Sequence, residues 1–236
     1  MRAIAVRELE AYYNTMIGYA FMSICLLVTG IFFASNNLIG LSASFNDVLG
    51  SISYVMILIT PLLTMRLFAE DRKNKTEQML LTAPVSIGKI VIGKYMAAMS
   101  VLILTLLVTA IFPAILFMLG TPSISEILLG YFGLILLSSA FISIGMFISA
   151  NTVNQLTAAV SSMGVLLLFW LVDALVPSVT NPALNSILNA ISLYKQFESF
   201  LMGVLSVSSV VYFVSFTLLF LFFTMRSIEK RRWSRG

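Results

Sequence analysis

The sequence of 236 residues contains no histidine and only one cysteine, and 10% of its residues are charged. Without histidine, the chain cannot form histidine-ligated metal or haem sites, histidine-based proton relays, or hydrolytic sites that use a histidine base. The single cysteine, Cys25, lies inside an apolar run and excludes a disulfide framework. Soluble domains average roughly 25% charged residues, so this composition excludes an ordinary soluble domain.

Hydrophobic residues make up 59% of the chain, which is more than a globular core can hide. Lipid is therefore the expected solvent for most of the side chains. Several apolar runs reach the roughly 20 residues that a helix needs to cross a bilayer. We predict an all-α, polytopic membrane protein with six spans in a single transmembrane domain, residues 1–236. The expected spans are about residues 16–33, 48–65, 96–119, 126–148, 156–176 and 204–225.

Lys and Arg are distributed unevenly between the two sides of the predicted membrane domain. Thirteen of the fourteen lie in the N-terminal stretch, in the segment 66–95 or in the C-terminal tail, and Lys195 is the exception. The positive-inside rule places the side that is richer in Lys and Arg in the cytoplasm. Both termini and the 66–95 segment are therefore expected there. Because these cations flank spans, the net charge of +4 indicates membrane lipid as a partner and not nucleic acid.

Two stretches outside the spans are predicted to form short helices. In residues 1–15, Ile4, Leu9 and Tyr12 share one helical side, which is typical of a helix that lies in the membrane interface. Residues 177–203 are too polar for a span and too apolar for a free loop, and their apolar residues recur at roughly helical spacing. We expect one or two short helices there that lie at the outer interface or re-enter the membrane before the sixth span.

The sequence has no motif for catalysis or for nucleotide binding. The phosphate-binding loop of nucleotide-binding proteins is absent, as are metal-binding Cys and His spacings and a nucleophile–base–acid set. The chain is therefore not expected to be an enzyme. Asp173 is the one ionisable residue in the interior of an expected span, where such residues are costly and usually functional. It is either an interfacial carboxylate that reaches the headgroups, or a gate or polar spot on a translocation route.

The segment 66–95 is the only long polar stretch between apolar runs, and it contains a short amphipathic piece. Thr76 or Asn74 can cap a helix over Glu77–Leu81, and Ser86 can cap a second helix that runs into the third span. One interpretation is a helix that inserts into a groove on a soluble partner and transmits its motion. The alternative is an interfacial helix whose cations only set topology.

The order of residues in this segment, AEDRKNKTEQMLLTAPVSIGKIVIGKYMAAM, resembles the pattern E-x-x-x-x-x-T-x-x-x-L-L-T-x-P-V-S-x-x-x-I-x-x-G-K of permease subunits of ABC-2-type transporters. The leader RELEAYYNTMIGYAF and the stretches FISANTVNQLTAAV and SLYKQFESFLMGVLSVSSVVYFVS are similar to the gliding-motility branch of that family. Together these stretches cover most of the chain, in order. The residues that match the first pattern are Glu70, Thr76, Leu80, Leu81, Thr82, Pro84, Val85, Ser86, Ile90, Gly93 and Lys94.

The resemblance implies a division of labour between subunits. Two six-span permease subunits, identical or different, would pair in the plasma membrane of a prokaryote, with spans two and five facing the partner and the transport route. Each would bind a separate cytoplasmic ATPase subunit that holds the ATP and Mg, so the permease itself would bind no cofactor directly. Export of hydrophobic or amphipathic molecules, or of polymers, is typical of the family. The residues expected to couple to the ATPase are Glu70, Thr76, Met79, Leu80, Leu81, Pro84, Ser86 and Lys89.

Two other functions are open on the residues alone, namely a gradient-driven secondary carrier and a scaffold subunit of another membrane complex. A carrier is expected to have several ionisable residues deep in its spans, and in this chain only Asp173 fits that description. The property that separates these functions is whether the 66–95 segment binds an ATPase.

Overall fold

The computed structural model describes residues 2–76, 86–176, 188–189 and 192–234. All regular elements in these ranges are helices, and none is a strand. Six helical segments among them are long and apolar enough to cross a membrane, which confirms the prediction of an all-α, multi-pass membrane protein. The six are α2 (Ile17–Phe33) continued by η1 (Ala34–Ile39), α3 (Asn46–Thr64), α6 (Ile87–Thr109) continued by α7 (Ile111–Leu119), α8 (Ile124–Asn151), α9 (Gln155–Leu175) and α12 (Val207–Ser234).

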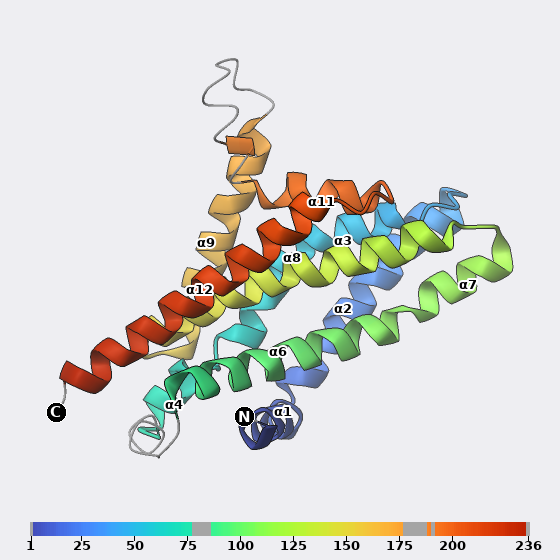
Figure 1. The fold of residues 1–236 in the computed structure, drawn as a ribbon. Coiled ribbons are helices and arrows are strands. Elements are labelled where there is room, and N and C mark those ends of the chain that lie inside the picture. Colours follow the sequence, from blue (N-terminus) through green and yellow to red (C-terminus); the bar gives the residue numbers. More distant parts are fainter. Residues whose placement is uncertain (1, 77–85, 177–187, 190–191, 235–236) are drawn as a thin grey trace.

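Three shorter helices flank these segments. The first is α1 (Arg2–Asn14), α4 (Ala69–Lys73) follows α3 after a turn, and α11 (Leu193–Leu201) precedes α12. In Figure 1, α1, α4 and the C-terminal end of α12 lie toward one end of the bundle, and α11 lies at the other. The N-terminal helix packs against α6 and α2, and its Tyr12 is fully buried. It is therefore a packed part of the bundle.

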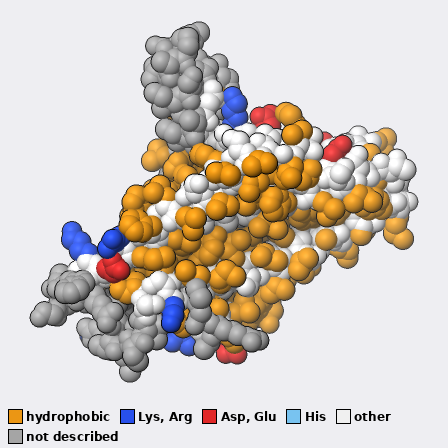
Figure 2. Space-filling model, in the orientation of Figure 1, with side chains coloured by type: hydrophobic (Ala, Val, Ile, Leu, Met, Phe, Trp, Pro, Cys, Tyr) orange, Lys and Arg blue, Asp and Glu red, His pale blue; other side chains and the backbone are white. Residues whose placement is uncertain are grey.

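Helices α3 and α8 form the centre of the bundle. In each of them 67% of the most apolar window is buried, against 39% or less in the other four long segments. Helix α8 packs against α3, α9, α11 and α12. Figure 2 shows that apolar side chains cover much of the outer surface. Such a surface is stable in lipid, because the backbone polar groups of a helix are satisfied within the helix itself.

Two glycines allow the neighbours of α8 to approach it closely. A Cβ atom at Gly145 would lie 2.7 Å from the Cβ of Thr64 in α3. A Cβ atom at Gly133 would lie 2.5 Å from the Cβ of Phe200 in α11. Small residues at such crossings bring helices together where the hydrophobic effect between them is weak, as it is in lipid. The position of α8 at the centre therefore depends on the absence of a side chain at these two positions.

The helix that contains the third expected span follows the prediction at its start and differs from it near its far end. It begins at Ile87, as expected for a helix that runs from Ser86 into the third span. Ser86 is the N-cap residue, as predicted, but its side chain makes no capping hydrogen bond. The helix is interrupted at Ala110 before α7 begins. Pro113 explains this break, because it lacks the N–H group that would bond to the carbonyl four residues earlier.

The connection between the first and second long segments is shorter than the expected loop of residues 34–47. Helical turns continue as a π-helix over Ala34–Ile39. The Asn37 side-chain amide then donates to the carbonyls of Ser42, at 2.7 Å, and Ser44, at 3.0 Å. These bonds satisfy two backbone acceptors of the remaining loop. This stretch, which is rich in Ser and Asn, is therefore a folded turn.

The link between α8 and α9 is also shorter than the expected range 149–155. Helix α8 continues to Asn151, and α9 begins at Gln155. Asn154 caps α9 by accepting a hydrogen bond from the Leu156 N–H at 3.1 Å. An Asn side chain at this position stabilises a helix start because it satisfies one of the otherwise unbonded N–H groups. The connection is therefore a tight turn.

Helix α11 lies where a short helix was predicted before the sixth span. The Asn46 side-chain amide ties its end to the bundle by donating to the carbonyls of Leu201, at 2.6 Å, and Glu126, at 3.2 Å. The other residues of the predicted region, 177–187 and 190–191, lie outside the described residues. The apolar side chains of α11 that are buried in the bundle are Leu193, Phe197 and Phe200.

Replacing Gly145 or Gly133 with Ala is expected to lower the unfolding temperature, because the new Cβ atom would collide with Thr64 or Phe200. Overpacking of this kind typically costs about 1–3 kcal/mol. The measurement is thermal unfolding of the purified variants in detergent.

Gly164→Ala in α9 is the matched control for this comparison. A Cβ atom there meets nothing within 4 Å, and Ala favours a helix over Gly by up to about 1 kcal/mol. We therefore expect no loss of stability in the control. Equal unfolding temperatures for all three variants would contradict the close approach of α3 and α11 to α8.

Candidate functional site

The residues predicted to couple to an ATPase lie at and beyond the base of the 66–95 segment, where α3 leads into α4. Glu70 lies in α4, and Thr76 follows it. Ser86 and Lys89, at the start of α6, are exposed. The other four predicted residues, Met79, Leu80, Leu81 and Pro84, lie outside the described residues.

Lys94 of α6 is buried beside two carboxylates from other parts of the chain. Its side chain is 1% exposed. Its ammonium group lies 2.9 Å from Glu8 Oε1 in α1 and 2.8 Å from Asp71 Oδ2 in α4. The ammonium is also 5.4 Å from the centre of the Phe68 ring, which adds a cation–π attraction. One buried cation thus joins α1, α4 and α6.

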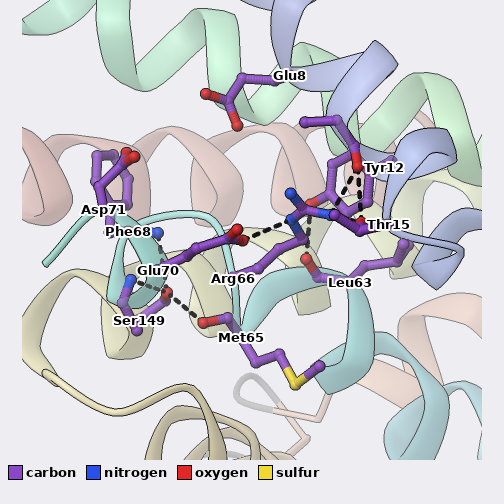
Figure 3. Close-up of polar contacts among 12 residues, drawn as sticks. Glu8, Tyr12, Thr15, Leu63, Met65, Arg66, Phe68, Glu70, Asp71 and Ser149 are labelled. Atoms are coloured by element: carbon purple, nitrogen blue, oxygen red, sulfur yellow. Dashed lines mark hydrogen bonds and ion pairs between the residues drawn. The ribbon is translucent and has the colours of Figure 1, made fainter. Parts of the chain in front are cut away.

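Arg66, in the turn after α3, is the second buried cation of this region (Figure 3). Its Nε lies 3.0 Å from Glu70 Oε2. Its Nη1 donates to the Ala11 carbonyl at 3.0 Å and to the Thr15 hydroxyl. The guanidinium lies 4.9 Å from the centre of the Tyr12 ring. Arg66 therefore holds the C-terminal half of α1 against the end of α3.

Tyr12 adds a further bond between α1 and α3. Its hydroxyl donates to the carbonyl of Leu63 at 2.6 Å. Leu63 lies in the last turn of α3, where helix carbonyls have no partner within the helix. Burial raises the pKa of the Tyr12 phenol, so this hydroxyl stays protonated and remains a donor. We refer to Glu8, Arg66, Glu70, Asp71 and Lys94 as the charge cluster.

The turn between α3 and α4 is fixed to the C-terminal end of α8. The Ser149 hydroxyl is fully buried and accepts from the backbone N–H groups of Phe68, at 3.1 Å, and Ala69, at 3.2 Å. It also donates to the carbonyl of Met65 at 3.2 Å, as Figure 3 shows. Arg72 of α4 donates to the carbonyl of Thr152 at 2.9 Å. Carbonyls at a helix C-terminus favour cations, so α4 is anchored on α8.

The ion pairs of the charge cluster hold the helices α1, α4 and α6 together. Burial raises the pKa of the Glu8 carboxyl, but the Lys94 ammonium and the Arg7 guanidinium lower it by more, so its pKa lies below the ordinary value of 4.5. Charges that are removed from water are stable only when they are paired. The pairs therefore resist any movement that would separate α1, α4 and α6.

Two of the sequence-predicted residues join this cluster and one lies far from it. Glu70 pairs with Arg66, and the Thr76 hydroxyl lies 3.1 Å from Asp71 Oδ1. Asp173 lies in α9 toward the opposite end of the bundle, near α11, where its Oδ2 accepts from the Tyr194 N–H at 3.4 Å. The structure therefore separates Glu70 and Thr76, two of the predicted coupling residues, from Asp173.

A comparison with models of protein families matches residues 10–228 to the family described as ABC-2 family transporter protein. The chain belongs to the ABC-2 transporter family. A comparison with curated proteins finds no match. The family resemblance of the sequence is thus confirmed, while the narrower likeness to the gliding-motility branch stays a prediction. Membrane proteins of the ABC-2 family work with ATPase subunits, which implies a nucleotide-binding partner for this chain.

The sequence contained a signal for the buried role of Lys94 in this ABC-2 protein. Ile87, Ile90, Val91 and Ala98 are buried on α6, and Lys94 lies three positions after Val91, on the same apolar face. Lys89 lies off that face and is exposed. A lysine in register with apolar residues indicates a buried ion pair, whereas the residues that pair with it cannot be read from periodicity.

Lys94→Met is expected to destabilise the protein, because it removes the cation between the Glu8 and Asp71 carboxylates and leaves Glu8 with the Arg7 guanidinium alone, at 2.9 Å. Breaking a buried ion pair by removing one partner costs about 3 kcal/mol or more, and we expect the lower end because Asp71 is 18% exposed. The measurement is thermal or denaturant unfolding in detergent. Lys89→Met, on the same helix but exposed, is the matched control.

A second variant separates the ion pairs from other effects of the substitution. Adding Glu8→Gln and Asp71→Asn to Lys94→Met removes both carboxylates and should recover part of the lost stability. If Lys94→Met unfolds like Lys89→Met, the buried pairs contribute nothing.

The lowered pKa of Glu8 predicts a pH dependence of the unfolding free energy. A carboxyl group whose pKa is lower in the folded state contributes stability that is fully present above its unfolded pKa and is lost as the pH falls through its folded pKa. The stability difference between wild type and Glu8→Gln should therefore be constant above pH 4.5 and shrink below it. A difference that grows on acidification would contradict the assignment.

Proposed function

We propose that this chain is the permease subunit of an ATP-driven exporter and that its 66–95 segment couples it to a separate cytoplasmic ATPase. The observation that carries the proposal is the attachment of α4 to α1, α6 and α8 at the base of that segment. The chain performs no chemistry in this scheme. The partner ATPase binds ATP and Mg, and the permease converts its motion into a change at the transport route.

For a motion of the ATPase to reach the transport route, the region around α4 must move together with the bundle. Helix α4 contacts α6 and α1 through Lys94, and its end is held to α8 through Arg72 and the Ser149 hydroxyl. Arg66 joins the preceding turn to α1. Separating buried ion pairs in a medium of low dielectric is costly. A push on residues 77–85 would therefore displace the bound helices rather than α4 alone.

The position of α4 supports a cytoplasmic coupling site. In Figure 1 it lies at the same end as both termini, which is the end that holds thirteen of the fourteen Lys and Arg. By the positive-inside rule this end faces the cytoplasm. An ATPase would therefore bind at this end, and the likeness to the ABC-2 family leads us to propose a prokaryotic plasma membrane as the location.

Pairing with a second permease subunit is the other part of the proposal. Helix α9 is the least covered long segment, with 17% of its most apolar window buried. Helix α3, the second expected pairing element, is mostly buried and presents Tyr54 and Leu58 at the surface. A second subunit would therefore contact α9 over most of its length and α3 along a narrow stripe. The exposed apolar residues of α9 are Leu156, Val160, Met163, Leu167, Leu168, Trp170, Leu171 and Leu175.

The test is whether an ATPase is bound through residues 77–85. Affinity purification of the chain from its native membrane in mild detergent should recover a nucleotide-binding subunit. A Leu80→Asp/Leu81→Asp variant should lose most of that subunit, because carboxylates would enter an apolar contact. Its unfolding temperature should match that of wild type.

The control for this variant is Leu80→Met/Leu81→Met, which keeps the apolar volume and should keep the ATPase. Recovery of the same amount of ATPase with the Asp variant would show that coupling does not use these leucines. If no ATPase accompanies the wild-type chain in any of several detergents, the proposed coupling is wrong.

A further inference from the structure

A cleft lies between α3, α9 and α11, toward the end of the bundle opposite to α4 (Figure 1). Its volume is about 510 Å³, which is within the roughly 300–1,000 Å³ of ordinary ligand pockets. The charge cluster takes no part in this cleft. The lining residues that define its chemistry are Tyr54, Trp170, Asp173, Tyr194, Lys195 and Glu198.

Aromatic rings form much of the wall. Tyr54 of α3 stacks on Tyr194 of α11, with ring centroids 4.6 Å apart and planes 25° apart. Trp170 of α9 lines the same cleft and is 41% exposed. The faces of aromatic rings carry partial negative charge and attract organic cations. Three rings from three helices therefore present a surface that suits a flat or bulky cationic molecule.

The charged groups of the cleft favour a cation as well. The carboxylates of Asp173 and Glu198 both line it. The one ammonium group in the described lining belongs to Lys195, and it already donates to the Asn189 side-chain oxygen at 2.6 Å. The cleft thus holds two carboxylates against one cation that is bonded to a neighbour.

Asp173 has unused bonding capacity that points to a ligand. Its carboxyl group accepts a hydrogen bond from the Ser192 side chain, and its Oδ2 accepts from the Tyr194 N–H at the long distance of 3.4 Å. Its Oδ1 is buried and has no hydrogen-bond partner among the described residues. A carboxylate oxygen that has lost water without gaining a donor is costly. A cation bound in the cleft would offset that cost.

We propose that this cleft binds an organic cation with an apolar body. A metal ion is a poorer match, because the described residues contain no group of three carboxylate, His or Cys side chains that could hold one. Anions are disfavoured by the two carboxylates. Binding itself needs no ATPase. The further step, in which the bound cation is a transported substrate, rests on the proposed export function.

The two tryptophans of the chain, Trp170 and Trp233, make the proposal measurable. In a Trp233→Phe background, Trp170 is the one remaining indole and reports on the cleft. The purified permease is titrated in detergent, without ATPase, with tetraphenylphosphonium. We expect a saturable change in Trp170 emission. Tetraphenylborate has the same shape and the opposite charge, and it should give no saturable change.

Substitutions then test the carboxylates. Asp173→Asn and Glu198→Gln should each raise the Kd for tetraphenylphosphonium by about tenfold, which corresponds to about 1.4 kcal/mol. Glu10→Gln is the matched control, because Glu10 is exposed in α1, at the end of the bundle opposite to this cleft, and its substitution should leave the Kd unchanged. Glu198 is also exposed, so Glu198→Gln tests the site even if Asp173→Asn fails to fold.

Three outcomes would overturn the proposal. Equal binding of both tetraphenyl ions would show an apolar groove without charge selection. An equal effect of Glu10→Gln and Glu198→Gln would show general surface attraction. A linear, unsaturable signal would show partitioning into the micelle. Because no ATPase is present, these outcomes are independent of whether residues 77–85 bind one.

Discussion

The contact on which the α4 end of the bundle depends is the buried Lys94 ammonium between Glu8 and Asp71. Each of these three residues comes from a different helix, and the buried ammonium is stable there only because the two carboxylates pair with it. The pairs therefore fix the N-terminal helix and α4 on α6 at the same time. Arg66, the second buried cation, likewise joins two elements, because it ties α1 to the end of α3. These contacts hold α4, which contains the predicted coupling residue Glu70, in place.

The two ends of the bundle use different physical forces. At the end with α4, ion pairs and bonds to carbonyls of α8 hold the elements together. Through the centre, close packing of α8 against α3 and α11 replaces them, at Gly145 and Gly133. At the far end a polar and aromatic cleft opens between α3, α9 and α11. Helix α3 contributes to both ends, with Arg66 just beyond its last turn and Tyr54 at the cleft. It is therefore one direct physical connection between the proposed coupling site and the proposed binding site, beside α8 and α9.

Much of the fold could be predicted because membrane helices are specified locally. The length of each apolar run indicated six spans, and the order of residues in the 66–95 segment indicated the family. Helix ends were less well predicted, because polar residues such as Asn37 and Asn154 extend or cap helices beyond the apolar run. The central position of α8 was not visible, since hydropathy does not distinguish a face that contacts lipid from one that contacts another helix.

The sequence by itself determined the membrane class, the six apolar segments, the cation-rich side and the membership in the ABC-2 family. The tertiary structure alone decided which cations are buried, which carboxylates they pair with, and which side chains meet in the cleft. Glu8 and Lys94 are 86 positions apart along the chain, and no periodicity relates them. Local sequence patterns indicate whether a segment is apolar or polar, and therefore which surroundings it favours. Partners that are distant in sequence are chosen only when several helices pack together and every buried charge finds an opposite one.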